Sequence, residues 1–322
     1  MTSSPVLRLV VRRLLMTIPI IVGVSILTFW VLSLIPGNAA QQLLGADATP
    51  GQVRDLSLQL GLDKSGPERY LEWLGGAATG DLGESMVGGQ AVTELLANRL
   101  PVSAELVALA FAVSLLAAIP LALLAARRPN GVVDRLSMLL SVTGLSMANY
   151  VLALLLVLVF AVLLGVLPAI GFVPISESLA GNLRSVILPV LALAFPLFCF
   201  YTRFLRGDLV EQMESQDYVD TARAKGVGPW RVLVMHAFRN SSFGLLTLVG
   251  LNVGSLIGGT VIIEQIFAIP GLGQLLLQAI NTRDAVVVQA CVVVFAVVAV
   301  LANLVVDLLY AVLDPRIRYG SH

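Results

Sequence analysis

Six long apolar runs divide the chain, at residues 14–35, 102–126, 136–167, 186–206, 241–263 and 285–311. Each run is long enough, and poor enough in charge, to cross a bilayer as a helix. Hydrophobic residues make up 57% of the 322-residue chain and charged residues only 12%. This balance excludes the two soluble domains that the length would otherwise allow. The pattern therefore predicts an all-α membrane protein with about six transmembrane helices.

The third run, 136–167, is too long for a single straight span. As one helix it would extend about 48 Å at 1.5 Å per residue, whereas the hydrocarbon core measures about 30 Å. The softer patch TGLSMANY, from Thr143 to Tyr150, is where we expect a break or a polar pore lining.

The fifth run carries Gly250, Gly254 and Gly258 at four-residue spacing. Such spacing predicts a smooth ridge for close helix packing. Asn252 and Ser255 add polarity to the same run without charge. Together with Asn149 they are our first candidates for the lining of a translocation path.

The distribution of basic residues predicts the topology. With the N-terminus inside, 14 of the 20 Lys and Arg residues fall in cytoplasmic segments, which favours cytoplasmic placement of both termini. Residues 1–13 are then a cytoplasmic N-terminus and 36–101 an external segment. The apolar run after the basic start is about 22 residues long and has no small-x-small cleavage site, so we expect a retained span and not a signal peptide.

The longest of the segments that the topology places in the cytoplasm is the polar stretch 208–240. Good helix formers occupy Tyr218 to Lys225, and Gly226 stands where a left-handed helix cap is expected. Pro229 can begin a second helix. The stretch predicts two short helices at an angle, joined by a Gly-Val-Gly turn. It is either a docking site for a soluble partner, which small side chains at 222, 224 and 226 would let approach closely, or an amphipathic loop on an anionic leaflet.

Two external segments have sequences that predict where short helices begin and end. Residues 67–74 (PERYLEWL) predict a short helix with Tyr70, Leu71, Trp73 and Leu74 on or near one face. In 264–290, the Ile-Pro-Gly-Leu-Gly sequence predicts a helix break followed by a short helix. The segment 36–101 is either a docking surface for a substrate-delivering protein or a small cap over the outer mouth.

The stretch DYVDTARAKGV, from Asp217 to Val227, resembles the coupling motif of ABC-type importer permeases, in the form used by the dipeptide, oligopeptide and nickel group. Val232, His236, Arg239 and Asn240 continue the match. Four further segments resemble the same group: 12–37, the GDLGESM sequence at 80–86, EQIFAIPGLG from Glu264, and 303–320. Gly244 lies near the position where the family usually has a proline.

This resemblance implies a type I ABC importer-like permease fold, with a core at 102–320, a short C-terminal end at 321–322 and cytoplasmic coupling helices. It implies import of di- or oligopeptides across the bacterial plasma (inner) membrane, although nickel and glutathione systems share the motifs. The implied partners are a second homologous permease subunit, two cytoplasmic ABC ATPase subunits and an external substrate-binding protein. The residues implied in ATPase coupling are Asp217, Tyr218, Asp220, Thr221, Ala222, Arg223, Ala224, Lys225, Gly226, His236, Arg239 and Asn240.

The sequence favours no cofactor and no catalytic site on this chain. It has no G-x-x-x-x-G-K-[ST] loop, so ATP and Mg²⁺ are expected on the partner ATPases. Cys199 and Cys291 lie in separate apolar runs without C-x-x-C spacing, and no nucleophile–base pair is evident. We therefore expect buried thiols, no metal site and no catalysis by this chain.

A proton- or sodium-coupled transporter and a membrane scaffold are the other classes considered. Coupled transport usually needs ionisable residues near mid-membrane, whereas Glu105, Arg203, Glu264 and Asp307 fall near the ends of the predicted spans. A scaffold or membrane enzyme would leave the stretch 208–240 without an explanation.

Overall fold

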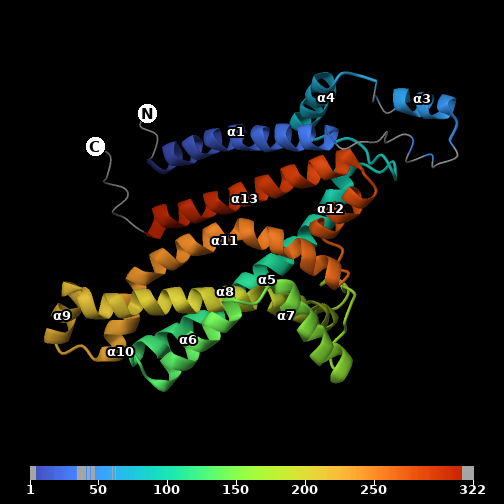
Figure 1. Cartoon of the computed structure of the whole chain (residues 1–322). Helices are drawn as coiled ribbons and strands as arrows, with labels where there is room; N and C mark the ends of the chain where they lie inside the picture. The colour runs from blue at the N-terminus through green and yellow to red at the C-terminus, as the bar shows by residue number, and fades with distance from the viewer. Residues whose placement is uncertain are drawn as a thin grey trace. The chain divides into compact units, whose positions relative to one another are not determined.

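Helices account for nearly all of the regular structure in this computed structural model (Figure 1). It describes residues 5–34, 41, 44, 48–59, 61 and 63–313. Within them, no strand occurs apart from an isolated bridge between Glu84 and Ala91. The helices are α1 (Pro5–Ser33), α3 (Pro50–Gln59), α4 (Gly66–Thr79), α5 (Val92–Arg127), α6 (Val132–Leu145), α7 (Asn149–Leu156), the π-helix η1 (Val157–Leu163), α8 (Leu179–Ser215), α9 (Asp217–Ala224), α10 (Pro229–Val232), the π-helix η2 (Leu233–Ala237), α11 (Phe238–Ile266), α12 (Leu272–Asn281) and α13 (Ala285–Leu313).

The predicted all-α class is confirmed, and the predicted spans are close to the observed helices. Within the described residues, five helices are long and apolar enough to cross a membrane, or six if the bent pair α6 and α7–η1 is one span. The observed helices extend beyond several predicted spans. α5 begins at Val92, before residue 102, and α8 covers 179–215 where 186–206 was predicted. An apolar run ends where polar residues begin, but a helix can continue into polar residues because its backbone hydrogen bonds do not depend on hydropathy.

The chain forms two compact units. Unit 1 contains residues 1–103 and 270–304, and unit 2 contains residues 104–269 and 305–322. The helices α5 and α13 therefore contribute residues to both units.

In unit 1, the short helix predicted after the Ile-Pro-Gly-Leu-Gly sequence is α12. One face of α12 packs against the start of α5 and the first turns of α13, in a cluster that includes Val92, Leu272, Leu275 and Cys291. The backbone N–H of Leu272 also donates to Ser103 Oγ at 2.8 Å. The apolar face of α12 is thus buried within unit 1.

The GDLGESM sequence of unit 1 is tied to the beginning of α13. Ser85 Oγ donates to Asp284 Oδ2 at 2.6 Å, and Asp284 Oδ1 accepts from the Val287 N–H at 3.2 Å. Gly83 has φ +88°, and a Cβ there would come within 3.1 Å of Val286. A side chain at Gly83 would therefore meet both backbone strain and a close neighbour.

The helix α4 packs on α1 through aromatic contacts. Tyr70 donates or accepts a hydrogen bond of 2.8 Å with Ser25 Oγ, and its ring lies 5.4 Å from that of Phe29. Leu71 departs from the predicted common face, because 64% of its surface is exposed. Each residue of a helix is rotated by about 100° from the one before it. Leu71 therefore points about 100° away from Tyr70 and about 160° away from Trp73, and lies off the side that faces α1.

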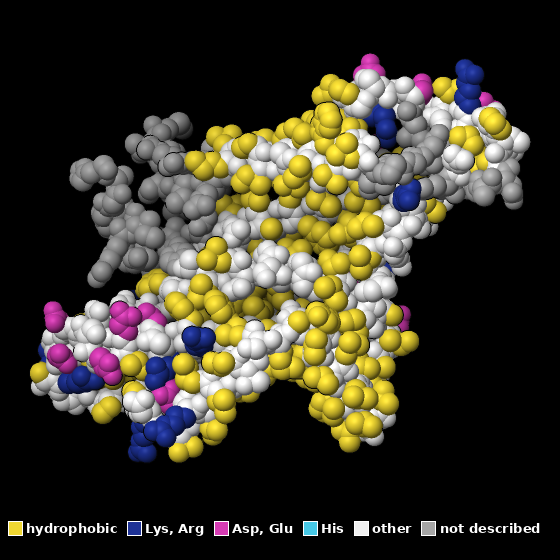
Figure 2. All heavy atoms as spheres, in the orientation of Figure 1, with side chains coloured by type: hydrophobic (Ala, Val, Ile, Leu, Met, Phe, Trp, Pro, Cys, Tyr) yellow, Lys and Arg dark blue, Asp and Glu magenta, His cyan; other side chains and the backbone are white. Residues whose placement is uncertain are grey.

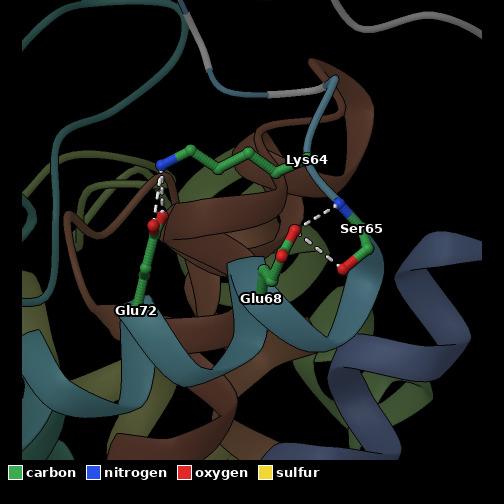
Figure 3. A network of polar contacts seen from close by, with 4 residues as sticks. All are labelled: Lys64, Ser65, Glu68 and Glu72. Carbon is green, nitrogen blue, oxygen red and sulfur yellow. Dashed lines mark hydrogen bonds and ion pairs between the residues drawn. The ribbon is translucent and has the colours of Figure 1, made fainter.

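The exposed start of α4 carries a polar network (Figure 3). The carboxylate of Glu68 accepts from both the hydroxyl and the backbone N–H of Ser65, as in a capping box. The bond from the Ser65 hydroxyl lowers the pKa of Glu68. Lys64 pairs with Glu72 at 2.7 Å, and this hydrogen bond raises the pKa of Lys64.

In unit 2, α6, α7 and α11 all pack against α8 (Figure 1). The long third apolar run breaks as predicted: α6 and the α7–η1 helix meet at 102° across Ser146–Ala148. Gly144 allows the close approach of α6 to α8, since a Cβ there would overlap Cys199 and lie 2.9 Å from Phe195.

A buried ion pair joins the beginning of α6 to α8. Arg206 Nε and Nη2 donate to the two carboxylate oxygens of Asp134 at 2.7 and 2.6 Å. The backbone N–H of Asn130 donates to the same carboxylate at 2.7 Å. The Asp134 side chain is 4% exposed and that of Arg206 is 20% exposed. Bidentate geometry of this kind is among the stronger polar contacts in proteins.

The predicted glycine ridge of α11 is only partly used inside the described chain. A Cβ on Gly250 would come within 2.9 Å of Val306 in α13, so this glycine permits close packing. A Cβ on Gly254 or Gly258 would meet nothing within 4 Å among the described residues. Packing within the chain therefore accounts for one glycine of the three.

Gly144→Ala should destabilise the chain, because overpacking of a close helix contact costs about 1–3 kcal/mol. The matched control is Gly254→Ala, another helical glycine, whose added methyl group meets open space. Thermal unfolding of the full chain in detergent measures both. Equal melting temperatures for the two variants would show that the α6–α8 approach tolerates a methyl group.

Asp134→Asn should cost about 3 kcal/mol, because it leaves the Arg206 charge largely buried without its counter-ion. Glu72→Gln, which breaks the exposed pair with Lys64, should have little effect on stability because water screens that pair. The denaturation midpoints of the two variants provide the comparison. A loss for Asp134→Asn no larger than that for Glu72→Gln would contradict the assigned strength of the buried pair.

Candidate functional site

The turn between α9 and α10 has the predicted left-handed cap. Gly226 has φ +78°. Its N–H donates to Arg223 O at 2.9 Å, and the Val227 N–H donates to Ala222 O at 3.2 Å. This is the pair of bonds of a Schellman motif, which ends a helix by reversing the chain. Gly228 and Pro229 then begin α10, as the proline position predicted.

The inner face of α9 is apolar and packs onto its neighbours in unit 2. Val219 and Val232 are fully buried and Ala222 is 5% exposed. They form one cluster, with Met213, Tyr218 and Val227 packed around it. Ala222 therefore fills an internal contact, which corrects the expectation that its small side chain admits a partner. Ala224 and Gly226 are exposed, as that expectation requires.

Polar contacts hold α9 to the end of α8. The Tyr218 hydroxyl donates to Gln212 Oε1 at 2.7 Å, and Arg223 Nη2 donates to the Met213 carbonyl at 3.0 Å. Burial raises the pKa of Tyr218, so its hydroxyl remains a donor. Asn240 Nδ2 donates to the same Gln212 oxygen at 3.1 Å.

Gln212 is the residue of this site that the sequence did not reveal. It lies six positions before Tyr218 and 28 before Asn240. Neither separation is a helical neighbour spacing. The contact with Tyr218 exists because Gln216 is extended (φ −110°, ψ 122°) and turns the chain between α8 and α9.

The predicted second short helix is not a separate element. α10, η2 and α11 follow one another without a break from Pro229 to Ile266. No helix-ending residue stands between them, and the π-helical turn η2 absorbs the change in register. His236 lies in η2, half-buried, and its Nδ1 has no hydrogen-bond partner among the described residues. Arg127, from the end of α5, lies 5.6 Å from the ring of Trp230.

The outer surface of this end of unit 2 is charged, as Figure 2 shows over α9 and α10, whereas hydrophobic side chains cover α7. Tyr218 and His236 are half-buried and Ala222 is buried. The other nine residues of the predicted coupling set are exposed: Asp217, Asp220, Thr221, Arg223, Ala224, Lys225, Gly226, Arg239 and Asn240. Of the predicted set, the structure ties Tyr218, Arg223 and Asn240 to the end of α8.

The three path candidates lie in unit 2, one at the start of α7 and two on α11. The Asn149 amide lies beside Gly259 of α11, 3.4 Å from the position of a Cβ on that glycine. Asn252 is seven residues before Gly259, close to two helical turns, and so lies on the same side of α11. Its Nδ2 donates to Leu248 O at 2.8 Å. Ser255, between them, is exposed.

Two carboxylates of unit 2 outside the α9–α10 turn lie near the ends of predicted spans, at Glu105 and Glu264. Glu105 accepts from Asn182 Nδ2 at 2.8 Å. Glu264, in the last turn of α11, is fully buried. The side chain of Asp307, residues 314–320 of the C-terminal match, and His322 lie outside the described residues. Within the described part of the chain, no group of three or more His, Cys, Asp or Glu residues is arranged to hold a metal.

Comparison with solved structures gives the fold. A chain of the MetNI methionine ABC transporter, solved in inward-facing conformations, matches 68% of this chain and 96% of its own length. The TM-score is 0.53 and the sequence identity 16%. The two chains therefore share a helical fold.

Comparison with known sequences covers almost the whole chain. A relative from Brucella abortus (strain 2308), a permease protein named for a peptide transport system, is 41% identical over 97% of this chain and 99% of its own. The oligopeptide transport system permease protein AppB of Bacillus subtilis (strain 168) is 36% identical over 96% of this chain and 99% of its own.

Two family models match the chain in succession. Residues 6–107 match the N-terminal region of binding-protein-dependent transport system membrane components. Residues 118–319 match the binding-protein-dependent transport system inner membrane component. The chain therefore belongs to the family of binding-protein-dependent transport system inner membrane components.

Proposed function

We propose that this chain is the permease subunit of an ATP-driven importer of di- or oligopeptides, and that separate ATPase subunits drive it by docking on α9. The observation that carries the proposal is the two-sided nature of α9. Its inner face packs onto α8 through Val219 and Ala222, while its outer face presents an exposed, charged surface. A helix held on one side and free on the other can receive a partner and pass on its displacement.

Membership of the family supports this proposal. The chain is a multi-pass protein of the bacterial inner membrane. Permease subunits of this family are not catalytic themselves and work with ATPase and substrate-binding proteins. We place both termini and the α9–α10 turn in the cytoplasm, because the basic residues are concentrated in those segments.

The residues of the site divide into two roles. The exposed side chains contact the ATPase: Asp217, Asp220, Thr221, Arg223, Ala224, Lys225, Gly226, Arg239 and Asn240. Tyr218, Ala222 and His236 hold the turn in position from within. ATP and Mg²⁺ bind to the partner ATPases, and this chain itself carries no cofactor and no catalytic group.

Transport then follows from two populated states of the spans. Two ATPases close on ATP and displace α9 on this chain and its counterpart on a second homologous permease. The spans reorient between outward and inward states, whose populations ATP binding shifts. Asn149, Asn252 and Ser255 line the path as uncharged polar groups. An external binding protein delivers the substrate, for which the names of the Brucella and Bacillus relatives favour a peptide.

Purification of the tagged chain from native membranes should recover two ATPase chains and a second permease in fixed ratio. Reconstituted with the binding protein, this complex should take up labelled dipeptides or oligopeptides only with ATP. Glutathione and a nickel chelate are the competing substrates in the same assay. Recovery of the chain alone in several mild detergents would contradict the assembly, and uptake of a competitor without peptide would contradict the substrate.

Gly226→Val should reduce ATP-driven uptake, because a β-branched residue at φ +78° costs about 1–2 kcal/mol and displaces the end of α9. Gly228→Val is the matched control. Its backbone is extended (φ −61°, ψ 148°), and an added Cβ would meet nothing within 4 Å. We expect an uptake about tenfold lower for Gly226→Val and near wild type for Gly228→Val, with tenfold equal to 1.4 kcal/mol. Equal uptake by both variants would count against a role for this turn.

A further inference from the structure

We propose that Gln212 is a positioning residue for energy coupling, and that its side-chain oxygen joins α9 to two spans at once. The inference rests on the proposed function and names a residue outside the coupling motif. Gln212 lies in the last turns of α8. A single atom, Oε1, accepts from Tyr218 of α9 at 2.7 Å and from Asn240 of α11 at 3.1 Å.

This arrangement links three helices of unit 2 through one acceptor. α8 and α11 are long apolar helices of the kind that cross a membrane. α9 is the short helix between them that carries the exposed charged surface. A displacement of α9 is therefore transmitted to the ends of both α8 and α11, as long as the two hydrogen bonds hold.

Further contacts between α8 and α9 surround the hydrogen bonds of Gln212. Arg223 Nη2 donates to the carbonyl of Met213, the residue next to Gln212. Met213 and Tyr218 also pack against the buried cluster of Val219, Ala222 and Val232. Gln212 and Tyr218 are half-buried, so water competes less with their hydrogen bond than at an exposed site. Apolar packing holds α9 against α8 and α10, and the Gln212 oxygen adds a polar contact that joins α8 and α9 to α11.

The chemistry of the link predicts which substitutions it tolerates. Both bonds use Gln212 as an acceptor, through Oε1. A glutamate has the same length and accepts through two oxygens, so Gln212→Glu preserves both bonds. Gln212→Leu keeps much of the packing volume and removes the acceptor. Gln216→Leu is the matched control, because it removes the same side chain four residues later, at a half-buried position.

The experiment measures ATP hydrolysed per labelled peptide taken up by the complete complex in proteoliposomes. Only assembled complexes, isolated by size exclusion, are compared, so a loss of stability alone does not change the ratio. We expect Gln212→Leu to raise the ratio about tenfold, which corresponds to 1.4 kcal/mol. Gln212→Glu and Gln216→Leu should stay within about twofold of wild type, a difference below 0.5 kcal/mol.

Further variants keep the test decisive if Gln212→Leu does not assemble. Tyr218→Phe removes one donor and retains the ring in the apolar cluster, and Asn240→Leu removes the other. Each should raise the ratio by less than Gln212→Leu, and adding either to a Gln212→Leu complex should change little. An unchanged ratio in Gln212→Leu, or in both donor variants, would overturn the proposal, as would a raised ratio in Gln212→Glu. Failure of the wild-type complex to take up peptide with ATP would instead refute the proposed function.

Discussion

A backbone amide in the hydrocarbon core of a bilayer has no water to bond with, so each segment that crosses must satisfy its hydrogen bonds internally. Long continuous helices such as α5, α8 and α13 meet this requirement. Where a helix is interrupted, its lost backbone hydrogen bonds must be replaced by other local interactions. In unit 2 the interruptions include the α6–α7 bend and the α9–α10 turn.

The interruptions of unit 2 are supported by different interactions. At the α6–α7 bend, Gly144 lets the end of α6 lie close to α8, while the Asp134–Arg206 pair secures the other end of α6. At the α9–α10 turn, a Schellman motif satisfies the free carbonyls, and a small apolar cluster packs the turn onto α8. Packing thus makes the α6–α7 bend a fixed part of the fold, whereas the α9–α10 turn combines a fixed inner face with an exposed outer one.

Because α9 has an apolar inner face and a charged outer face, the chain can present a polar surface without destabilising its membrane-length helices. The charged residues of α9 are exposed, so they cost little desolvation free energy within the fold. The apolar residues of the same helix remain in contact with α8 and α10. A continuous path from Pro229 through η2 to Ile266 then connects the turn to a membrane-length helix. Gln212 Oε1 adds a polar contact that joins α8, α9 and α11.

The sequence alone determined the all-α class, the approximate spans, the break within 143–150 and the left-handed cap at Gly226, because these follow from local periodicity and backbone preference. Motif resemblance led to the family, which the sequence comparisons confirmed. Tertiary structure decided that Ala222 is buried and that the helix after Pro229 continues into α11. It decided, too, that no described residue packs on Gly254 or Gly258. It also decided the meeting of Gln212, Tyr218 and Asn240. Their separations in sequence carry no helical spacing, and only the extended backbone at Gln216 and the packing of α11 on α8 bring them together.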